Sequence, residues 1–219
     1  MADNVIEAIL RERIVVIVRG VKKEDLIPFA EAVYKGGIRL IECTFDATGA
    51  VSDEETAANI KMLSEHFGDK MLIGAGTVLN EKQVVLTKEA GGKFIISPDV
   101  NEDVIRKTKS EGLVSMPGAL TPSEATMADR AGADFVKLFP IASMGGTYLK
   151  NIKAPLSHIK FMAVGGINLG NMREFTEAGA CGFGISSDIA NKKLISEGRF
   201  DLIEERAKSY IDLIKELYK

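Results

Sequence analysis

Short apolar runs alternate with amphipathic stretches along the whole chain, and this alternation limits the possible folds more than any other feature. Each run is rich in β-branched or aromatic residues, as in buried strands, and each is followed by residues with helical spacing. The predicted strands cover residues 14–20, 38–44, 71–76, 93–97, 113–116, 135–139, 160–164 and 181–185. Alternating strand–helix units build parallel sheets, and eight units close into a (β/α)₈ barrel. We therefore expect an α/β fold, with one barrel domain over residues 1–219 and a short helix at residues 5–13 before the first strand.

An open, doubly wound parallel sheet is the competing architecture. It is typically marked by a G-x-G-x-x-G loop after a strand. Both Gly74-Ala75-Gly76 and Gly182-Phe183-Gly184 lack the third glycine. A chain of 219 residues also fits the short end of the barrel range, which is roughly 200 to 400 residues. The closed barrel is therefore the better prediction.

Composition excludes several classes of function. The net charge is −3 with no basic stripe, which argues against nucleic-acid binding, and no apolar run is long enough to span a membrane. Residues 1–13 lack the apolar core of a signal peptide. Cys43 and Cys181 lie in strand-like runs and give no disulfide framework, which favours a reducing cytoplasm. His66 and His158 are expected at the surface near helix ends, and no cluster has metal-ligand spacing, so no metal is predicted.

One lysine stands inside an apolar strand. Alternate side chains of a strand share a face, so Phe135, Lys137 and Phe139 point the same way. Burial disfavours the ammonium form and lowers the pKa of a lysine, and a neutral lysine can form a Schiff base with a carbonyl substrate. The alternative is a lysine whose stem packs in the core while its head reaches water or a carboxylate.

Polar and special residues gather at the ends of the predicted strands. In a (β/α)₈ barrel the functional groups lie at the carboxyl ends of the strands. Those ends are Arg19, Glu42 with Thr44, Thr77, Pro98, Pro117, Lys137 with Phe139, Gly165-Gly166 and Ser186. By contrast, Lys93 and Lys160 begin strands and are expected at the opposite end in solvent. The sequence therefore predicts a site at one mouth of the barrel.

Two kinds of chemistry can be assigned to that mouth. Strand parity brings Arg19, Glu42 and Lys137 towards the barrel axis, where Glu42 could move protons or simply form a salt bridge with Arg19 or Lys137. The last two strand ends carry Gly165-Gly166 and Ser186, and a helix is predicted to begin near residue 170. Backbone N–H groups and a helix N-terminus could hold a phosphate there, although glycine turns alone are a weak signal.

The combination of motifs resembles a known family over nearly the full chain, the class I 2-keto-3-deoxy-6-phosphogluconate (KDPG) and 2-keto-4-hydroxyglutarate (KHG) aldolases. The matching stretches are Ile17-Val18-Arg19, residues 37–44 with Ile41-Glu42, Gly74-Ala75-Gly76-Thr77-Val78, Ile96-Ser97-Pro98, Met116-Pro117-Gly118, residues 135–140 and Val164-Gly165-Gly166-Ile167.

The resemblance implies a homotrimer of (β/α)₈ barrels that acts in the cytoplasm, in Entner–Doudoroff carbohydrate metabolism. The implied substrates are KDPG, cleaved to pyruvate and glyceraldehyde 3-phosphate, and 4-hydroxy-2-oxoglutarate, cleaved to pyruvate and glyoxylate. It implies no metal and no organic cofactor. In these terms Lys137 is the Schiff-base lysine and Glu42 the general acid/base. Thr77, Pro98 and Phe139 match the pyruvate pocket, and Arg19, Gly165, Gly166 and Ser186 match the side for the phosphate and distal hydroxyls.

Two positions depart from the family pattern. Asp46 stands where the best-known members have an arginine for the pyruvate carboxylate, so we expect Thr77 and backbone N–H groups to take over that task. Val164 resembles members that handle the galactonate isomer, whereas gluconate-selective members often have threonine there. Alternative functions are therefore a 2-keto-3-deoxy-6-phosphogalactonate aldolase, another phosphate-binding isomerase or decarboxylase, or a non-catalytic barrel that binds sugar phosphates.

Overall fold

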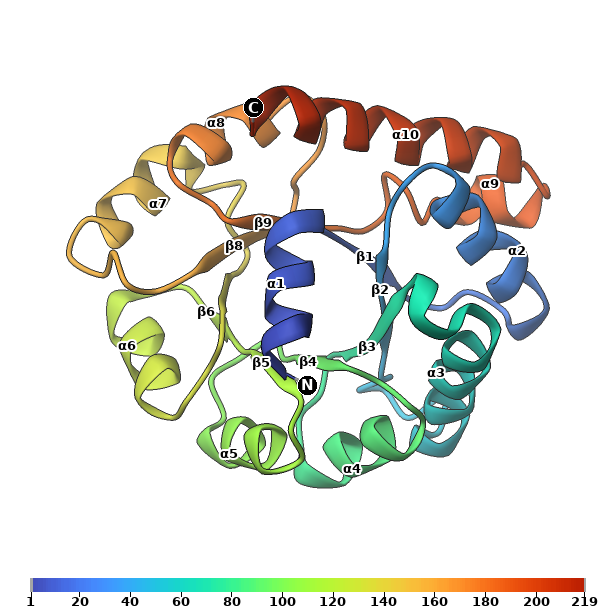
Figure 1. The fold of residues 1–219 in the computed structure, drawn as a ribbon, viewed down its shortest axis with the longest axis horizontal. Coiled ribbons are helices and arrows are strands. Elements are labelled where there is room, and N and C mark those ends of the chain that lie inside the picture. Colours follow the sequence, from blue (N-terminus) through green and yellow to red (C-terminus); the bar gives the residue numbers. More distant parts are fainter. Residues whose placement is uncertain (1, 219) are drawn as a thin grey trace.

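The predicted barrel is present. The computed structural model describes residues 2–218, and Met1 and Lys219, the ends of the predicted domain, lie outside the described residues. Nine parallel strands form a nearly closed barrel with helices around it (Figure 1). The strands are β1 (Ile14–Val18), β2 (Leu40–Thr44), β3 (Leu72–Gly76), β4 (Phe94–Ile96), β5 (Val114–Met116), β6 (Gly118–Ala119), β7 (Val136–Leu138), β8 (Phe161–Val164) and β9 (Gly182–Ile185).

The ninth strand arises because the chain pairs again directly after Pro117, where the predicted fifth strand ends. Proline has no N–H to donate to a ladder, and the chain resumes as β6 directly after it. β5 pairs with β4, whereas β6 pairs with β7, so the two edges of the sheet meet at this break. The carbonyl of Pro117 still accepts a 2.9 Å bond from the N–H of Lys137. Gly118 is needed here, since a Cβ would lie 2.3 Å from the carbonyl oxygen of Pro98.

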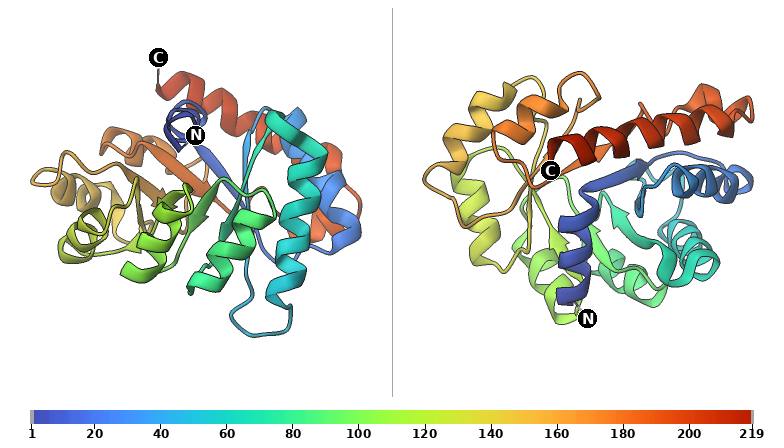
Figure 2. Two further views of the ribbon diagram at one scale, coloured as in Figure 1. Left: turned by 60° about the horizontal axis from the view of Figure 1, so that its bottom comes forward. Right: turned by 45° about the horizontal axis from the view of Figure 1, so that its top comes forward.

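Most helices follow the strands in alternation and surround the barrel (Figures 1 and 2). They are α2 (Lys23–Lys35), α3 (Asp53–Phe67) with a short 3₁₀ turn η1 (Gly68–Lys70), α4 (Glu81–Glu89), α5 (Glu102–Ser110), α6 (Pro122–Arg130), α7 (Gly145–Lys153), α8 (Met172–Glu177), α9 (Lys192–Ser196) and α10 (Phe200–Leu217). One predicted start is a complete capping box, in which Thr121 and Glu124 each bond the other's backbone N–H. Within residues 2–218 no helix has the length and apolarity needed to cross a bilayer.

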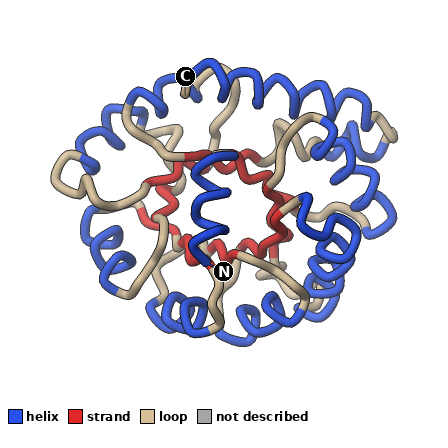
Figure 3. Tube along the Cα trace, in the orientation of Figure 1, coloured by secondary structure: helices blue, strands red, loops and turns tan. Residues whose placement is uncertain are grey.

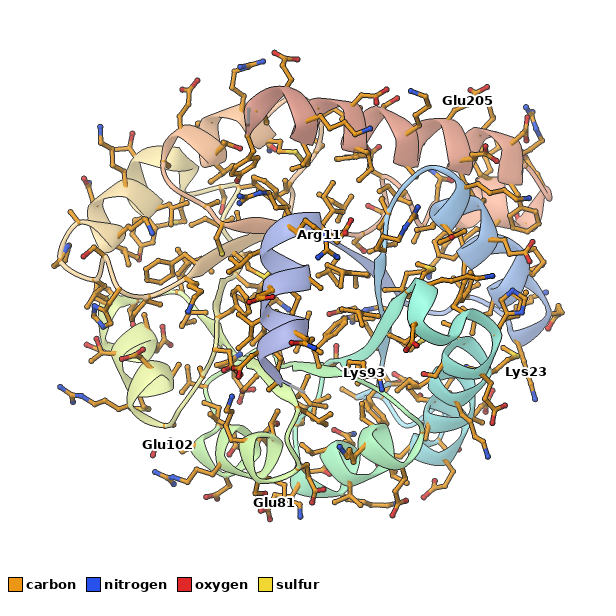
Figure 4. The ribbon with its side chains drawn as sticks, in the orientation of Figure 1. Arg11, Lys23, Glu81, Lys93, Glu102 and Glu205 are labelled. Carbon is orange, nitrogen blue, oxygen red and sulfur yellow. The ribbon has the colours of Figure 1, made fainter. Side chains whose placement is uncertain are left out.

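The remaining helix, α1 (Ala2–Glu12), lies across the amino-terminal end of the barrel (Figures 1 and 3). Its buried residue, Ile9, joins an apolar cluster inside the barrel with Leu40, Phe94 and Phe135. Gly74 makes room for this packing, because a Cβ there would lie 2.3 Å from the ring of Phe94. Figure 4 views the molecule from this end and places Lys93 beside the strands, where it is exposed as expected.

Candidate active site

The opposite, carboxyl-terminal end of the barrel is hollow. A cavity of about 530 Å³ opens there, and all nine site residues expected from the sequence line it. They are Arg19, Glu42, Thr77, Pro98, Lys137, Phe139, Gly165, Gly166 and Ser186. The nine residues therefore lie at one mouth of the barrel, as predicted. Glu42 belongs to β2 and Lys137 to β7, and the others lie in the segments that follow the strands.

Lys137 reaches the cavity from the inner face of β7. Two residues earlier, Phe135 points into the apolar cluster inside the barrel, as strand parity requires. Lys137 is 8% exposed, and its Nζ lies 4.7 Å from the ring centroid of Phe139. Burial lowers the pKa of Lys137; the Glu42 carboxylate opposes this shift and Arg19 adds to it. The amine is thus held closer to its neutral, nucleophilic form than a solvated lysine.

Glu42 is the second buried ionisable group of the cavity, at 2% exposure. Gly76 on the neighbouring strand gives it space, since a Cβ there would lie 2.3 Å from Oε1 of Glu42. Burial raises its pKa to about 7, against the opposing charges of Lys137 and Arg19. Within the described part of the chain its Oε2 has no hydrogen-bond partner and it forms no ion pair, so the predicted alternative of a salt bridge is wrong. A carboxyl group with this pKa can both give and take a proton near neutral pH.

Arg19 is linked to Thr77, a residue that the resemblance assigns to the pyruvate pocket. Its Nη2 donates a 3.0 Å hydrogen bond to Oγ1 of Thr77, the residue after β3. Thr77 has a φ of +54°, an uncommon conformation for a β-branched residue. Arg19 lines the same cavity as Gly165 and Ser186, and β1, which it follows, pairs with β9, which precedes Ser186.

Asp46 lies outside the main cavity and organises its own loop. Its carboxylate accepts hydrogen bonds from the N–H and hydroxyl of Thr48 and from the N–H of Val51. The backbone bond from Thr48 contributes most to holding the pKa of Asp46 below its ordinary value. The sequence rightly indicated that this position offers no cation to a substrate, but it gave no sign that the aspartate closes a turn.

The glycine end of the cavity differs from the prediction in one respect. The expected helix, α8, begins at Met172 and has only six residues, and the N–H groups of Asn168 and Gly170 before it are bonded to asparagine side chains. These two N–H groups already have acceptors within the protein. Instead, the hydrogen bonds within residues 2–218 leave the backbone N–H groups of Gly166, Ser186 and Ser187 without a protein acceptor.

Sequence reasoning missed two polar residues of this end, Asn168 and Asp188. Both come two residues after a site residue, in the loops that follow β8 and β9. Their position in these loops was the available signal. They were missed because only residues at the predicted strand ends were taken as candidates.

Comparisons with known proteins show which family the chain belongs to. The family model described as "KDPG and KHG aldolase" matches residues 5–206. The chain belongs to the KDPG and KHG aldolase family. It is therefore an aldolase, a lyase, and residues 5–206 include every lining residue of the cavity.

Relatives of this aldolase are named for different substrates. The chain is 33% identical over 177 residues to the 2-dehydro-3-deoxy-6-phosphogalactonate aldolase of Escherichia coli, covering 80% of this chain and 83% of that one. It is 31% identical over 217 residues to the 2-dehydro-3-deoxy-phosphogluconate aldolase of Haemophilus influenzae, covering 97% and 98%. The KDPG aldolase of Legionella pneumophila, solved with pyruvate captured as a covalent carbinolamine, superposes with a TM-score of 0.81 at 28% identity over 93% of this chain and 97% of that one.

Proposed function

We propose that this aldolase cleaves a phosphorylated 2-keto-3-deoxy sugar acid to pyruvate and glyceraldehyde 3-phosphate through a Schiff base on Lys137. The supporting observation is the pair of buried groups in the cavity, an amine with a lowered pKa and a carboxyl group with a pKa of about 7. Aldol cleavage needs these two functions, a nucleophilic amine and a proton shuttle.

The amine of Lys137 attacks the C2 carbonyl of the substrate to give a carbinolamine, which loses water to become an iminium ion. Glu42, as the carboxylate, takes the proton of the C4 hydroxyl while the C3–C4 bond breaks. The bonding electrons move into the iminium to form an enamine, and the aldehyde leaves. Glu42 then returns its proton to C3, and water releases pyruvate and restores the amine.

The other end of the cavity suits the phosphate. Gly165 and Gly166 have φ values of +91° and +81°, a backbone conformation that glycine adopts without strain. Backbone N–H groups without protein acceptors at Gly166, Ser186 and Ser187 can donate to phosphate oxygens. Val164 resembles the residue of members that handle the galactonate isomer, and we propose that selectivity between the two isomers is relaxed. We also propose, from the resemblance, one aldolase domain over residues 1–219 and a homotrimer, for which light scattering after gel filtration is the test.

Reductive trapping tests the proposed Schiff base. Wild-type protein incubated with pyruvate and borohydride should gain the mass of one reduced pyruvyl group on the peptide that contains Lys137. Lys137→Arg should give no adduct and no cleavage, because a guanidinium stays protonated. Lys160→Arg is the matched control, since Lys160 is exposed and precedes β8 at the other end of the barrel.

Three other results would replace the proposal or part of it. A wild type without any pyruvate adduct would favour another phosphate-binding isomerase or decarboxylase, or a non-catalytic barrel. Undiminished trapping in Lys137→Arg would move the Schiff base to another lysine. Turnover of 4-hydroxy-2-oxoglutarate at a higher kcat/KM than either phosphorylated acid would favour the KHG substrate instead.

A further inference from the structure

An acidic side chain lies at the end of the cavity where the phosphate is expected. Asp188 follows Ser186 and Ser187 in the loop after β9, lines the cavity, and has a side chain that is 38% exposed. An uncompensated carboxylate here would repel an anionic ligand. The surroundings of Asp188 therefore decide whether this end can accept one.

Two residues of α10 donate hydrogen bonds to this carboxylate. Arg206 and Tyr210 are four residues apart and so share one face of the helix. Nη1 of Arg206 donates to the backbone carbonyl of Asp188 at 2.8 Å and to its Oδ1 at 2.9 Å. The hydroxyl of Tyr210 donates to Oδ2. The loop is thus held to α10 through both its side chain and its backbone.

Tyr210 also links this loop to the loop after β8. It is fully buried, and burial raises its pKa, as does its hydrogen bond to Asp188. The nearby backbone N–H of Leu169 opposes the shift in pKa, so the Tyr210 hydroxyl lies close to the loop after β8 as well as to Asp188. The two loops that it joins carry Gly166 and Ser186, whose N–H groups are the proposed phosphate donors.

We propose that Asp188, Arg206 and Tyr210 together position the distal end of the cavity and set its charge, with Arg206 offsetting the negative charge of Asp188 so that a phosphate is accepted. This inference rests on the proposed function. Arg206 does not line the cavity; it acts through Asp188 and is a positioning residue. Specificity for phosphorylated substrates then depends on a side chain of the last helix.

If charge balance is the cause, removing Arg206 and removing the charge of Asp188 should change the KM for a phosphorylated aldehyde in opposite directions. In Arg206→Gln the carboxylate of Asp188 is no longer offset, and the KM for glyceraldehyde 3-phosphate in condensation with pyruvate should rise about tenfold. In Asp188→Asn the charge of Arg206 is left unopposed, and the same KM should fall. Both variants should keep kcat, because neither change reaches Lys137 or Glu42.

The double variant separates charge from folding. Asp188→Asn combined with Arg206→Gln restores neutrality with side chains of similar shape, so its KM for the phosphorylated aldehyde should return to near the wild-type value. A purely structural role predicts additive losses in the double variant instead. Lys208→Gln is the matched control, since it removes a positive charge from an exposed ion pair with Asp212 on the same helix.

Unphosphorylated glyceraldehyde is the second probe. Its KM should change less than twofold in every variant, because it carries no charge at the distal end. A tenfold rise for both aldehydes in Arg206→Gln, or an unchanged KM for the phosphorylated one in Asp188→Asn, overturns this inference alone. A wild type that does not prefer the phosphorylated aldehyde overturns the proposed phosphate site, and with it this inference; the two failures are thus distinguished by the wild-type measurement.

Discussion

The two ends of the barrel are built from the same strands but hold opposite kinds of residue. At the end closed by α1, the inward positions of β2 and of the chain just before β7 are Leu40 and Phe135, which pack in an apolar cluster. Two residues further along, the same inner faces carry Glu42 and Lys137, both buried. One end therefore stabilises the fold by burying apolar area. The other end lowers its stability, because it holds ionisable groups away from water.

Because of this difference, substitutions at the two ends should affect different properties, stability at one end and catalysis at the other. Residues of the closed end have packing as their only evident task, so changes there should affect the free energy of unfolding and leave catalysis unaltered. Residues of the open end should behave in the reverse way, because active groups are held in environments that disfavour their charged forms.

After the loss of Lys137, the largest expected effect comes from Glu42→Gln. The proton shuttle is lost while the shape is kept, so kcat should fall by roughly 10²- to 10³-fold. Glu42 has a folded pKa of about 7 and an ordinary value of 4.5, so the folded state binds the extra proton between these pH values. The contribution of Glu42 to the free energy of unfolding therefore falls as pH rises from 4.5 to 7, by an amount of the order of 3 kcal/mol.

Denaturant unfolding at several pH values tests the predicted direction of this change in stability. Glu42→Gln should be more stable than the wild type above pH 7 and should lose this advantage towards pH 4.5. Removal of the carboxylate should also lower the pKa of Lys137 further, so the pH dependence of pyruvate trapping should move to lower pH. Glu65→Gln, an exposed change on α3, is the control. A variant less stable than the wild type at pH 8 would show that burial of Glu42 is not the dominant cost.

Ile9→Ala sharpens the comparison from the closed end. Ile9 is 1% exposed and connects α1 to the barrel interior. Loss of its side chain should lower the free energy of unfolding by about 2–4 kcal/mol, and kcat/KM should stay within about twofold of the wild type. Asn4→Ala, on the exposed side of α1, should change neither quantity. A large fall in kcat/KM for well-folded Ile9→Ala would show that the two ends are coupled.

The sequence predicts the barrel and the positions of the site because both depend on local periodicity. Parity alone places Lys137 and Glu42 on inner faces, and the parallel arrangement of the strands brings their ends together. The network around Asp188 could not be found in this way. It joins residues 18 and 22 positions apart, and only the packing of α10 against the loops brings them into contact.

The turn closed by Asp46 was missed for a related reason. An aspartate two residues before Thr48 is compatible with a self-bonded loop or with an open one, and local pattern does not distinguish them. The break at Pro117 was placed correctly as a strand end. The resumption of pairing after it depends on β7, which lies further along the chain.

The smallest expected effect concerns selectivity between the two substrate isomers, at the boundary between the apolar interior and the cavity. Val164 ends β8, lines the cavity and is 5% exposed, and both its methyl groups lie within 3 Å of the position a Cβ on Gly184 would take. It offers no hydrogen bond to a substrate hydroxyl, so the wild type should discriminate weakly between the gluconate and galactonate isomers. Val164→Thr replaces one methyl group by a hydroxyl and should shift the ratio of kcat/KM values towards the gluconate isomer by about three- to tenfold. Its stability should fall slightly, because the new hydroxyl is buried.

The measurement is kcat/KM for both phosphorylated acids in the wild type and the variant, with Val164→Ala as the control that removes volume without adding a polar group. A wild type that strongly prefers the gluconate isomer, together with an unchanged ratio in Val164→Thr, would place the selectivity in other residues of the cavity.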